Sequence, residues 1–277
     1  MGKIIRGEGL DRTDIDTPLR SVSFSSAAAG VAGKDSAVIK ILPDVTVMKI
    51  GGQSMMDRGK SAVYPFVEEV VANREKHKMM IGVGGGTRAR HAYAIALDLG
   101  MPTSVLAKLG MNVPMQNARM LQLLLAQHGG ILIDHEMFAQ LPLFYALNCI
   151  PIIPGMPPYS FWEKPAEKGR IPENRTDSGV YLTAEVLGAK ACLFCKDEKG
   201  LFTANPKADK NAKFIPRVHA QELLDMDLPD LIVEPVVLRN MLKSRHMKQI
   251  QVFNALEPGN LTRALNGEHV GTIIYVD

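Results

Sequence analysis

Two glycine-rich segments contain the residues of this sequence that could bind an anion. Gly51-Gly52 follows an apolar run that includes Lys49, and Gly84-Gly85-Gly86 follows a second apolar run and precedes Arg88. Glycine has no Cβ, so backbone N–H groups in such turns can approach a phosphate-like anion closely. A helix that begins after the turn adds about half a positive charge at its first turn. Either turn taken alone is equally compatible with a tight turn that binds nothing.

The spacing of these glycines excludes two common nucleotide sites. Neither segment matches Gly-x-Gly-x-x-Gly or Gly-x-x-x-x-Gly-Lys-Ser/Thr, so a Rossmann site and a P-loop are both ruled out. Two glycine turns, each after a strand-like run and before a helix-like run, nevertheless favour a ligand that carries phosphate groups.

The turns must be positioned by alternating strands and helices. Beyond residue 40, short β-branched runs alternate with segments of helical periodicity, which predicts an α/β fold. We expect a three-layer α/β/α sandwich with a mainly parallel central sheet. The expected strands are 45–50, 78–83, 131–133, 150–154, 191–196, 249–253 and 271–276. The expected helices are 60–71 (capped by Asp57), 87–99, 104–128, 177–188, 234–247 and 258–266. The prolines within 150–154 indicate an edge strand or an early strand end.

The first 40 residues differ from the rest of the chain. Residues 21–30 are small, polar and weakly patterned, so we expect an N-terminal arm over 1–40 and one domain over 41–277. Residues 1–16 mix charges and lack the apolar core of a signal peptide, which favours a cytoplasmic location.

The composition is that of a globular protein. Of 277 residues, 46% are hydrophobic and 22% are charged, which excludes collagen, coiled-coil rods and wholesale disorder. No run of 18 apolar residues is present, so we expect no membrane partner. A net charge of +3 argues neither for nor against nucleic acid, but an aromatic content of only 6% disfavours base-stacking surfaces, so we expect no nucleic-acid partner.

Cys192 and Cys195 have the spacing of a redox pair. They fall within the expected strand 191–196, where residues three apart point to opposite faces. We therefore expect structural thiols on opposite sides of the sheet.

Five motifs resemble the amino acid kinase superfamily, and its uridylate kinase branch in particular. They are Lys49-Ile50-Gly51-Gly52, Gly84-Gly85-Gly86-Thr87-Arg88, Arg175-Thr176-Asp177-Ser178, the segment 196–206, and Val252-Phe253-Asn254. The resemblance implies that Lys49, Gly51 and Gly52 contact the phosphates of ATP. It also implies that Asp177 lies near the catalytic centre, where it orients Lys49 or a Mg²⁺ ion, unless it only caps its helix. The family's nucleotide pocket corresponds to Lys196, Gly200, Phe202, Asn205 and Pro206.

Further segments resemble the molybdenum storage family, and its beta-type subunit most. They are 41–44, 49–54, 57–59, 87–91, 155–159 and 258–272. The resemblance implies that ATP is used to load molybdate or tungstate. The oxoanions would accumulate as polyoxometalate clusters in a closed hexamer of this chain, alone or with an alpha-type subunit. The implied cofactors are ATP, Mg²⁺ and the oxoanion.

The sequence departs from these families at informative positions. Lys196 stands where the alpha-type subunit has an acidic residue, and Asn205 stands where uridylate kinases have an aspartate. No acidic residue occurs between Asp98 and Asp134, the stretch in which uridylate kinases carry their ribose-binding aspartate. Gly84 to Gly86 and Arg88 could still hold a tetrahedral oxoanion. Thr87, Arg88 and His91 would share one helix face there.

By the same resemblance, oxoanion clusters would lie near Asp134, His135, Glu136 and Gln140. Carboxylates and imidazole can bind or protonate metal–oxo groups. The alternative is that Asp134 or Glu136 caps a helix and His135 is solvated. Two other functions stay open: a UMP-type small-molecule kinase, and a nucleotide-binding partner subunit without its own ATPase activity.

Overall fold

The chain divides into two units, Met1–Ile39 and Lys40–Asp277. The structure is a computed structural model, and it describes residues 3–6, 11–14, 37–158 and 162–277. In the first unit, β1 (Lys3–Arg6) pairs antiparallel with β2 (Asp11–Asp14), a strand pair that the weak patterning of this segment did not predict. The small polar run 21–30 lies outside the described residues.

The second unit is built on an eight-stranded sheet with the order β10-β12-β11-β7-β3-β4-β6-β5. Its strands are β3 (Val45–Ile50), β4 (Lys78–Val83), β5 (Gly130–Leu132), β6 (Ile150–Pro154), β7 (Ala191–Lys196), β10 (Arg217–His219), β11 (Gln249–Asn254) and β12 (Thr272–Tyr275). Neighbouring strands run parallel except β11 and β12. The expectation of a mainly parallel sheet is therefore confirmed.

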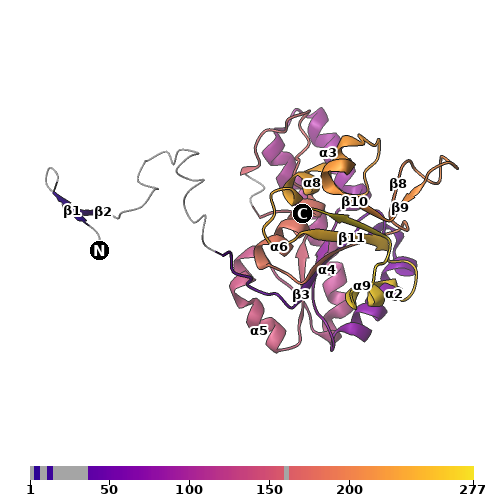
Figure 1. Cartoon of the computed structure of the whole chain (residues 1–277), viewed down its shortest axis with the longest axis horizontal. Coiled ribbons are helices and arrows are strands. Elements are labelled where there is room, and N and C mark those ends of the chain that lie inside the picture. Colours follow the sequence, from indigo (N-terminus) through magenta and orange to yellow (C-terminus); the bar gives the residue numbers. More distant parts are fainter. Residues whose placement is uncertain (1–2, 7–10, 15–36, 159–161) are drawn as a thin grey trace. The chain divides into compact units, whose positions relative to one another are not determined.

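Helices cover both faces of this sheet (Figure 1). One face carries α5 (Leu141–Ala146), α6 (Thr176–Leu187), α7 (Ala220–Asp225) and α8 (Pro235–Met241). The other carries α2 (Lys60–Asn73), α4 (Thr103–Leu125) and α9 (Asn260–Leu265). Against α4 packs α3 (Gly86–Asp98). The three-layer α/β/α arrangement is thus confirmed.

Short elements complete the unit. They are the 3-10 helices η1 (Met56–Arg58), η2 (Ala126–His128) and η3 (His135–Gln140), and the antiparallel pair β8 (Leu201–Phe202) and β9 (Phe214–Ile215). No helix in the described ranges is long and apolar enough to cross a membrane.

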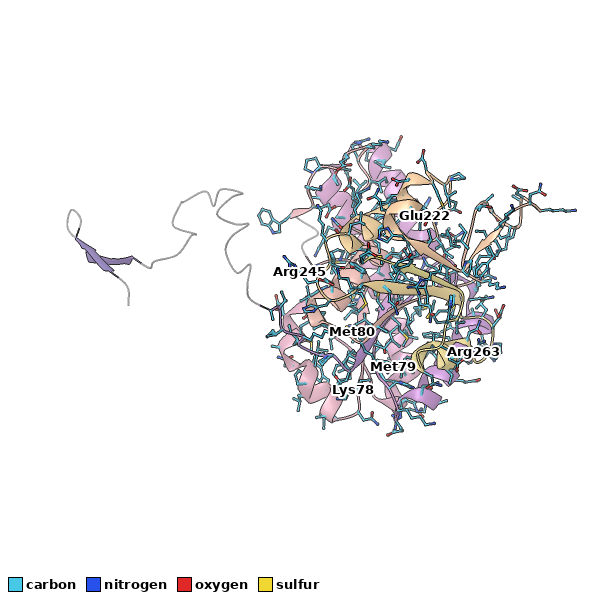
Figure 2. All side chains as sticks on the ribbon, in the orientation of Figure 1. Lys78, Met79, Met80, Glu222, Arg245 and Arg263 are labelled. Carbon is cyan, nitrogen blue, oxygen red and sulfur yellow. The ribbon has the colours of Figure 1, made fainter. Side chains whose placement is uncertain are left out.

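The central strands are apolar on both faces because helices cover both sides of the sheet. Met79 and Met80 are neighbours in β4 (Figure 2), yet Met79 packs under α2 and α4 and Met80 under the opposite helix layer. Cys192 and Cys195 likewise belong to opposite core layers, and both are buried free thiols. This confirms the structural interpretation of the two cysteines.

Of the two alternatives for 150–154, an edge strand or an early strand end, the edge strand is wrong. β6 lies between β4 and β5, and β5 forms the edge. The register explains why prolines are tolerated there: pairing with β4 begins only at Ile152, one residue after Pro151, and ends at Pro154. Pro151 is paired with Ile131 of β5 but precedes the pairing with β4, and Pro154 is the last residue paired with β4 and lies beyond the pairing with β5. Each proline therefore lies beyond the end of one of the two ladders.

The helix expected over 234–247 is shorter than predicted, since α8 ends at Met241. The carboxylate of Glu185 on α6 accepts hydrogen bonds from the amides of Arg245, His246 and Met247, at 2.5 to 3.2 Å. These amides turn toward Glu185 and cannot continue the helix, although no local sequence signal marks that change.

Candidate functional site

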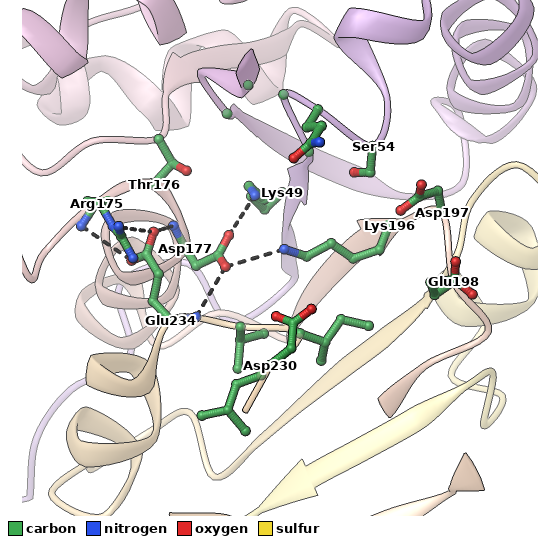
Figure 3. A pocket seen from close by; sticks show the side chains of 18 of the residues that line it. Lys49, Ser54, Arg175, Thr176, Asp177, Lys196, Asp197, Glu198, Asp230 and Glu234 are labelled. Carbon is green, nitrogen blue, oxygen red and sulfur yellow. Dashed lines mark hydrogen bonds and ion pairs between the residues drawn. The ribbon is translucent and has the colours of Figure 1, made fainter. Parts of the chain in front are cut away.

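Most of the residues expected to bind the nucleotide meet at the point of the sheet where successive strands are added on opposite sides of β3. From β3 the chain adds β4 on one side, and it later places β7 on the other side of β3. The carboxyl ends of these parallel strands border a cavity of about 970 Å³ (Figure 3). Such a switch point is the usual place for a ligand in an open α/β sheet.

The two glycine turns face each other at one wall of this cavity. A Cβ at Gly52 would lie 2.0 Å from the amide nitrogen of Gly86, and one at Gly84 would lie 2.7 Å from the amide nitrogen of Gly52. Gly86 also has a φ of +71°, which residues with side chains rarely adopt. Glycine is therefore required by the close approach of two backbones. Gly51, Gly52, Gly84, Gly85 and Gly86 all line the cavity.

Asn117 on α4 fixes the orientation of the second turn. Its side-chain amide donates to the carbonyl oxygens of Gly84 (2.7 Å) and Gly85 (3.3 Å), and the residue is fully buried. Because N–H and C=O point in opposite directions across a trans peptide, the amides of Gly85 and Gly86 point away from Asn117. Within the described part of the chain these two amides donate to no acceptor. Both glycines line the cavity, so their amides are candidate donors to an anion there.

Asp57 is placed differently from expectation. It was predicted to cap the helix that follows it, but Gly59 holds that position at the start of α2. The Asp57 carboxylate instead accepts a hydrogen bond from the amide of Thr87 at 2.6 Å, in the first turn of α3. This hydrogen bond links the segment after the first glycine turn to the helix after the second, although the two residues are 30 positions apart in the sequence.

Two buried lysines share one buried carboxylate at the centre of the cavity (Figure 3). The Nζ of Lys49 lies 2.6 Å from Asp177 Oδ1, and the Nζ of Lys196 lies 3.3 Å from Asp177 Oδ2. Their side chains are 6% and 14% exposed, and that of Asp177 is 7% exposed. Lysine is rarely buried to this degree without a partner. With two lysines and one aspartate, the cluster has a net charge of +1 when all three groups are ionised.

Burial and charge compete in setting the proton affinities of this cluster. Burial alone would raise the pKa of Asp177, but the charges of Lys196 and Lys49 outweigh it and hold that pKa well below the usual range. Burial lowers the pKa of Lys196 to about 8, although the Asp177 carboxylate opposes the shift. A desolvated ammonium beside an ionised aspartate is suited to meet a phosphoryl group.

Glu234 also lines the cavity, although none of the sequence motifs includes it. Its carboxylate accepts hydrogen bonds from the backbone amides of Arg175, Asp177 and Ser178, at 3.0 to 3.3 Å. These amides form the first turn of α6, so Glu234 caps that helix from 57 residues away in the sequence. Burial, followed by the charge of Asp177, raises the pKa of Glu234. In the sequence, Glu234 is recognisable only as the residue before Pro235 at the start of α8, and this position does not indicate its contact with α6.

The expected nucleotide segment borders the same cavity. Lys196, Gly200, Phe202, Asn205 and Pro206 all line it. Two ion pairs flank this end: Arg58 with Asp197, and Lys207 with Glu198. The first pair joins η1 to the residue that follows β7.

Of the cationic side chains near the second turn, Arg90 lines the cavity and Arg88 does not. The Arg88 guanidinium donates to the side chains of Gln116 and Asn117. Arg88 therefore supports the glycine turn through Asn117, and the face proposed for Thr87, Arg88 and His91 is not the face that meets the cavity. Tyr93, one turn beyond Arg90, also lines the cavity.

Most carboxylates around the cavity are engaged by other groups, which leaves few ligands for a protein-bound Mg²⁺ ion. Mg²⁺ prefers six oxygen ligands, usually including one or two free carboxylates. Both oxygens of Asp177 meet lysines, Asp197 and Glu198 pair with cations, and Asp57 and Glu234 accept backbone amides. Of the carboxylates that line the cavity in the described part of the chain, only that of Asp230 has no cation or amide partner. The Lys196 ammonium stands beside Asp177, where a metal ion would need to be. No group of three or more His, Cys, Asp or Glu side chains suited to a metal occurs among the described residues.

The residues expected to hold oxoanion clusters lie apart from this cavity. Asp134 accepts hydrogen bonds from the amides of Glu136 and Met137 and so caps η3, as the alternative interpretation held. His135 is half-buried, its ring 5.2 Å from that of Phe138, and burial lowers its pKa. Glu136 and Gln140 are exposed. None of the four lines the cavity, and their role toward metal–oxo groups stays a prediction.

Comparison with known proteins agrees with this geometry. Residues 44–248 match the model of the amino acid kinase family. The molybdenum storage protein subunit beta of Azotobacter vinelandii is 49% identical over 261 residues, which cover 94% of this chain and 97% of that protein. A uridylate kinase of Hyperthermus butylicus is 27% identical, over 72% of this chain and 83% of that protein.

Solved structures share the fold. The uridylate kinase of Archaeoglobus fulgidus superposes with a TM-score of 0.63 at 20% identity, covering 83% of this chain and 99% of the other. A UMP kinase of Bacillus anthracis gives 0.66 at 21% identity, covering 85% and 97%. With the family match spanning most of the second unit, the resemblance inferred from the motifs is confirmed, and the chain belongs to the amino acid kinase family.

Proposed function

We propose that this chain is a subunit that stores molybdate or tungstate and uses ATP to load it. The observation that carries the proposal is the 49% identity, over nearly the full length of both chains, to a protein named molybdenum storage protein subunit beta. The cavity supports it, because one end matches a nucleotide segment and the other offers free amides and Arg90 for an anion.

In this proposal ATP lies with its base toward Phe202, Asn205 and Pro206 and its phosphates toward Lys49, Gly51 and Gly52. The oxoanion binds at the amides of Gly85 and Gly86. Lys49 and Lys196 then oppose the negative charge of the phosphates, and Asp177 keeps both ammonium groups in place. Fixed cations in a water-poor site stabilise charge more effectively than they do in water.

In this proposal, Mg²⁺ reaches the cavity bound to the phosphates of ATP. Among the described residues, every carboxylate that lines the cavity except that of Asp230 is engaged by cations or amides, so Asp230 is the one carboxylate left to meet a Mg²⁺ ion that ATP carries. A Mg²⁺ ion bound to ATP supplies charge neutralisation, and Lys49 and Lys196 supply the same from the protein side.

The fate of the loaded oxoanion is a second part of the proposal. We infer that Asp134, His135, Glu136 and Gln140 face polyoxometalate clusters inside a cytoplasmic hexamer, formed by this chain alone or with an alpha-type subunit. The half-buried His135 could take up a proton as oxoanions condense. Replacing His135 with alanine tests this part, because it should lower the amount of retained metal without changing ATP binding.

The first experiment measures phosphate release from ATP by the purified chain with molybdate, tungstate, UMP or no addition, followed by metal analysis after gel filtration. Many metal atoms retained per chain, and only with ATP, is the expected result. Metal retention that does not depend on ATP would contradict the proposal. Lys49→Met should abolish loading, whereas Lys60→Met, at an exposed position on α2, is the matched control.

A second candidate is a UMP-type small-molecule kinase. It is favoured by relatives named uridylate kinase at 27–29% identity and by the solved structures of such kinases. UDP formation without metal retention would support it. The absence of both activities, with ATPase activity restored on mixing with an alpha-type chain, would support a nucleotide-binding partner subunit.

A further inference from the structure

Tyr93 on α3 and Gly110 on α4 are in close contact at the anion end of the cavity. A Cβ at Gly110 would lie 1.9 Å from the hydroxyl oxygen of Tyr93 and 2.4 Å from its Cζ. No residue but glycine can therefore occupy position 110 while the phenol stays in place. Glycine is unfavourable in a helix interior, so its presence in the middle of α4 is accounted for by this contact.

The phenol closes a wall of the cavity. Tyr93 is only 8% exposed and packs with Ala96 and Leu106, yet it lines the cavity together with Gly110. A ring held by a core cluster on one side and by a helix backbone on the other has little freedom to move. Burial raises the pKa of Tyr93 to about 12, so the phenol stays neutral at physiological pH and does not repel an anion.

The side chains that α3 and α4 bring to this end suit a bare anion. They are those of Ala89, Arg90, Tyr93 and Pro114, besides the glycines 86 and 110. None is a carboxylate or a carboxamide. Among the lining residues of these helices, the Tyr93 hydroxyl is the one side-chain acceptor that sugar hydroxyls would find at this wall, and further unpaired buried donors are costly. A small tetrahedral oxoanion needs only donors, which the amides of Gly85 and Gly86 and the Arg90 guanidinium provide.

We propose that Tyr93 is a specificity-determining residue, whose ring over Gly110 closes the anion end to a nucleoside monophosphate and leaves room for an inorganic oxoanion. The inference rests on the proposed function and names its substrate class: tetrahedral oxoanions without an organic substituent. A larger acceptor such as a nucleoside monophosphate could bind only if the space occupied by the Tyr93 ring were opened.

The test compares UMP and tungstate as ligands of the full chain in the presence of a non-hydrolysable ATP analogue. UMP binding is measured by isothermal titration calorimetry and tungstate binding by equilibrium dialysis. Wild type should show no UMP binding up to about 1 mM. Tyr93→Ala should bind UMP at least tenfold more tightly than that limit, while its tungstate affinity stays within about threefold of wild type. Tyr93→Phe is the matched variant, because it keeps the ring and should still exclude UMP.

Several outcomes would overturn the assignment. UMP binding by wild type with the affinity of Tyr93→Ala would show that the ring excludes nothing. Exclusion of UMP by a folded Tyr93→Ala would show that another group sets the specificity. Should truncation of the ring unfold the protein, as judged by circular dichroism, Tyr93→Leu is measured instead under the same criteria. Failure of wild type to retain tungstate with ATP would count against the proposed function, and the UMP comparison would still be interpretable by itself.

Discussion

Asp177 and Glu234 cap each other: the amide of Asp177 donates to the Glu234 carboxylate at 3.2 Å, and the amide of Glu234 donates to the Asp177 carboxylate at 3.3 Å. The pair joins the first turn of α6 to the start of α8. It also fixes the one carboxylate that both buried lysines share. The position of the charged cluster therefore depends on a residue that is 57 positions away.

Removing this cap should weaken both stability and nucleotide binding. Glu234→Ala leaves the amides of Arg175, Asp177 and Ser178, at the start of α6, without their acceptor, so we expect the free energy of unfolding to fall by about 2 kcal/mol. Glu234→Gln keeps one carbonyl oxygen and should lose about half as much. Urea denaturation measures both variants, and Glu222→Ala on the exposed side of α7 is the control. Equal stability of Glu234→Ala and wild type would contradict the role given to this carboxylate.

Nucleotide affinity should fall as the pH rises past the pKa of Lys196. That pKa is lowered to about 8, so the ammonium is mostly charged at pH 7 and mostly neutral at pH 9. A tenfold loss in the charged fraction corresponds to about a tenfold loss in affinity for the phosphates. Calorimetric titration with ATP between pH 7 and 9 measures the effect. Lys196→Met should bind weakly with no slope over this range, and an equally steep slope in that variant would contradict the assignment.

The lowered pKa of Lys196 also makes the free energy of unfolding depend on pH. The pKa of Lys196 falls from 10.5 in the unfolded chain to about 8 in the folded one. Between these values the unfolded chain holds a proton that the folded chain has released, so the free energy of unfolding should rise from pH 8 to 10.5. Below pH 8 both states are protonated and the contribution is constant. Urea denaturation of wild type and Lys196→Met, compared over this window, isolates the slope.

Asn117 should be needed for the shape of the second glycine turn. Asn117→Ala leaves the carbonyl oxygens of Gly84 and Gly85 without their donor, which should cost about 2 kcal/mol of stability and weaken tungstate binding. Gln116→Ala removes the neighbouring, exposed partner of Arg88 and should change stability by less than about 0.5 kcal/mol. Similar losses in the two variants would show that the contact with Arg88, and not the hold on the glycine carbonyls, is the important one.

The sequence was informative wherever the signal is local. The runs 45–50 and 78–83 form strands with the expected bounds, because buried parallel strands are apolar throughout and end at glycine. The glycine turns could be recognised because close backbone approach demands glycine. Lys49, Asp177 and Lys196 followed from family motifs, and the structure brings all three together.

The failures share a cause: each depends on a contact between distant segments. Asp57 caps α3, 30 residues away, and not the helix beside it. Glu185 ends α8 from 60 residues away. Arg88 turns toward Asn117, so that Arg90 meets the cavity, and no periodicity in α3 alone distinguishes these two faces. Sequence patterns report the burial of a face; they do not report which neighbour lies against it.

The engaged carboxylates lead to an expectation about divalent cations. Since Lys49 and Lys196 already neutralise the phosphate region, ATP should bind in EDTA with an affinity within about tenfold of that in Mg²⁺. Lys196→Asp would place a second carboxylate beside Asp177 and remove the ammonium, which creates a pair that Mg²⁺ can bridge. In this variant, ATP binding should become strongly dependent on Mg²⁺. Calorimetry with and without EDTA on both proteins tests the pair of expectations. A wild-type chain that loses ATP binding entirely in EDTA would show that the lysines do not replace the metal.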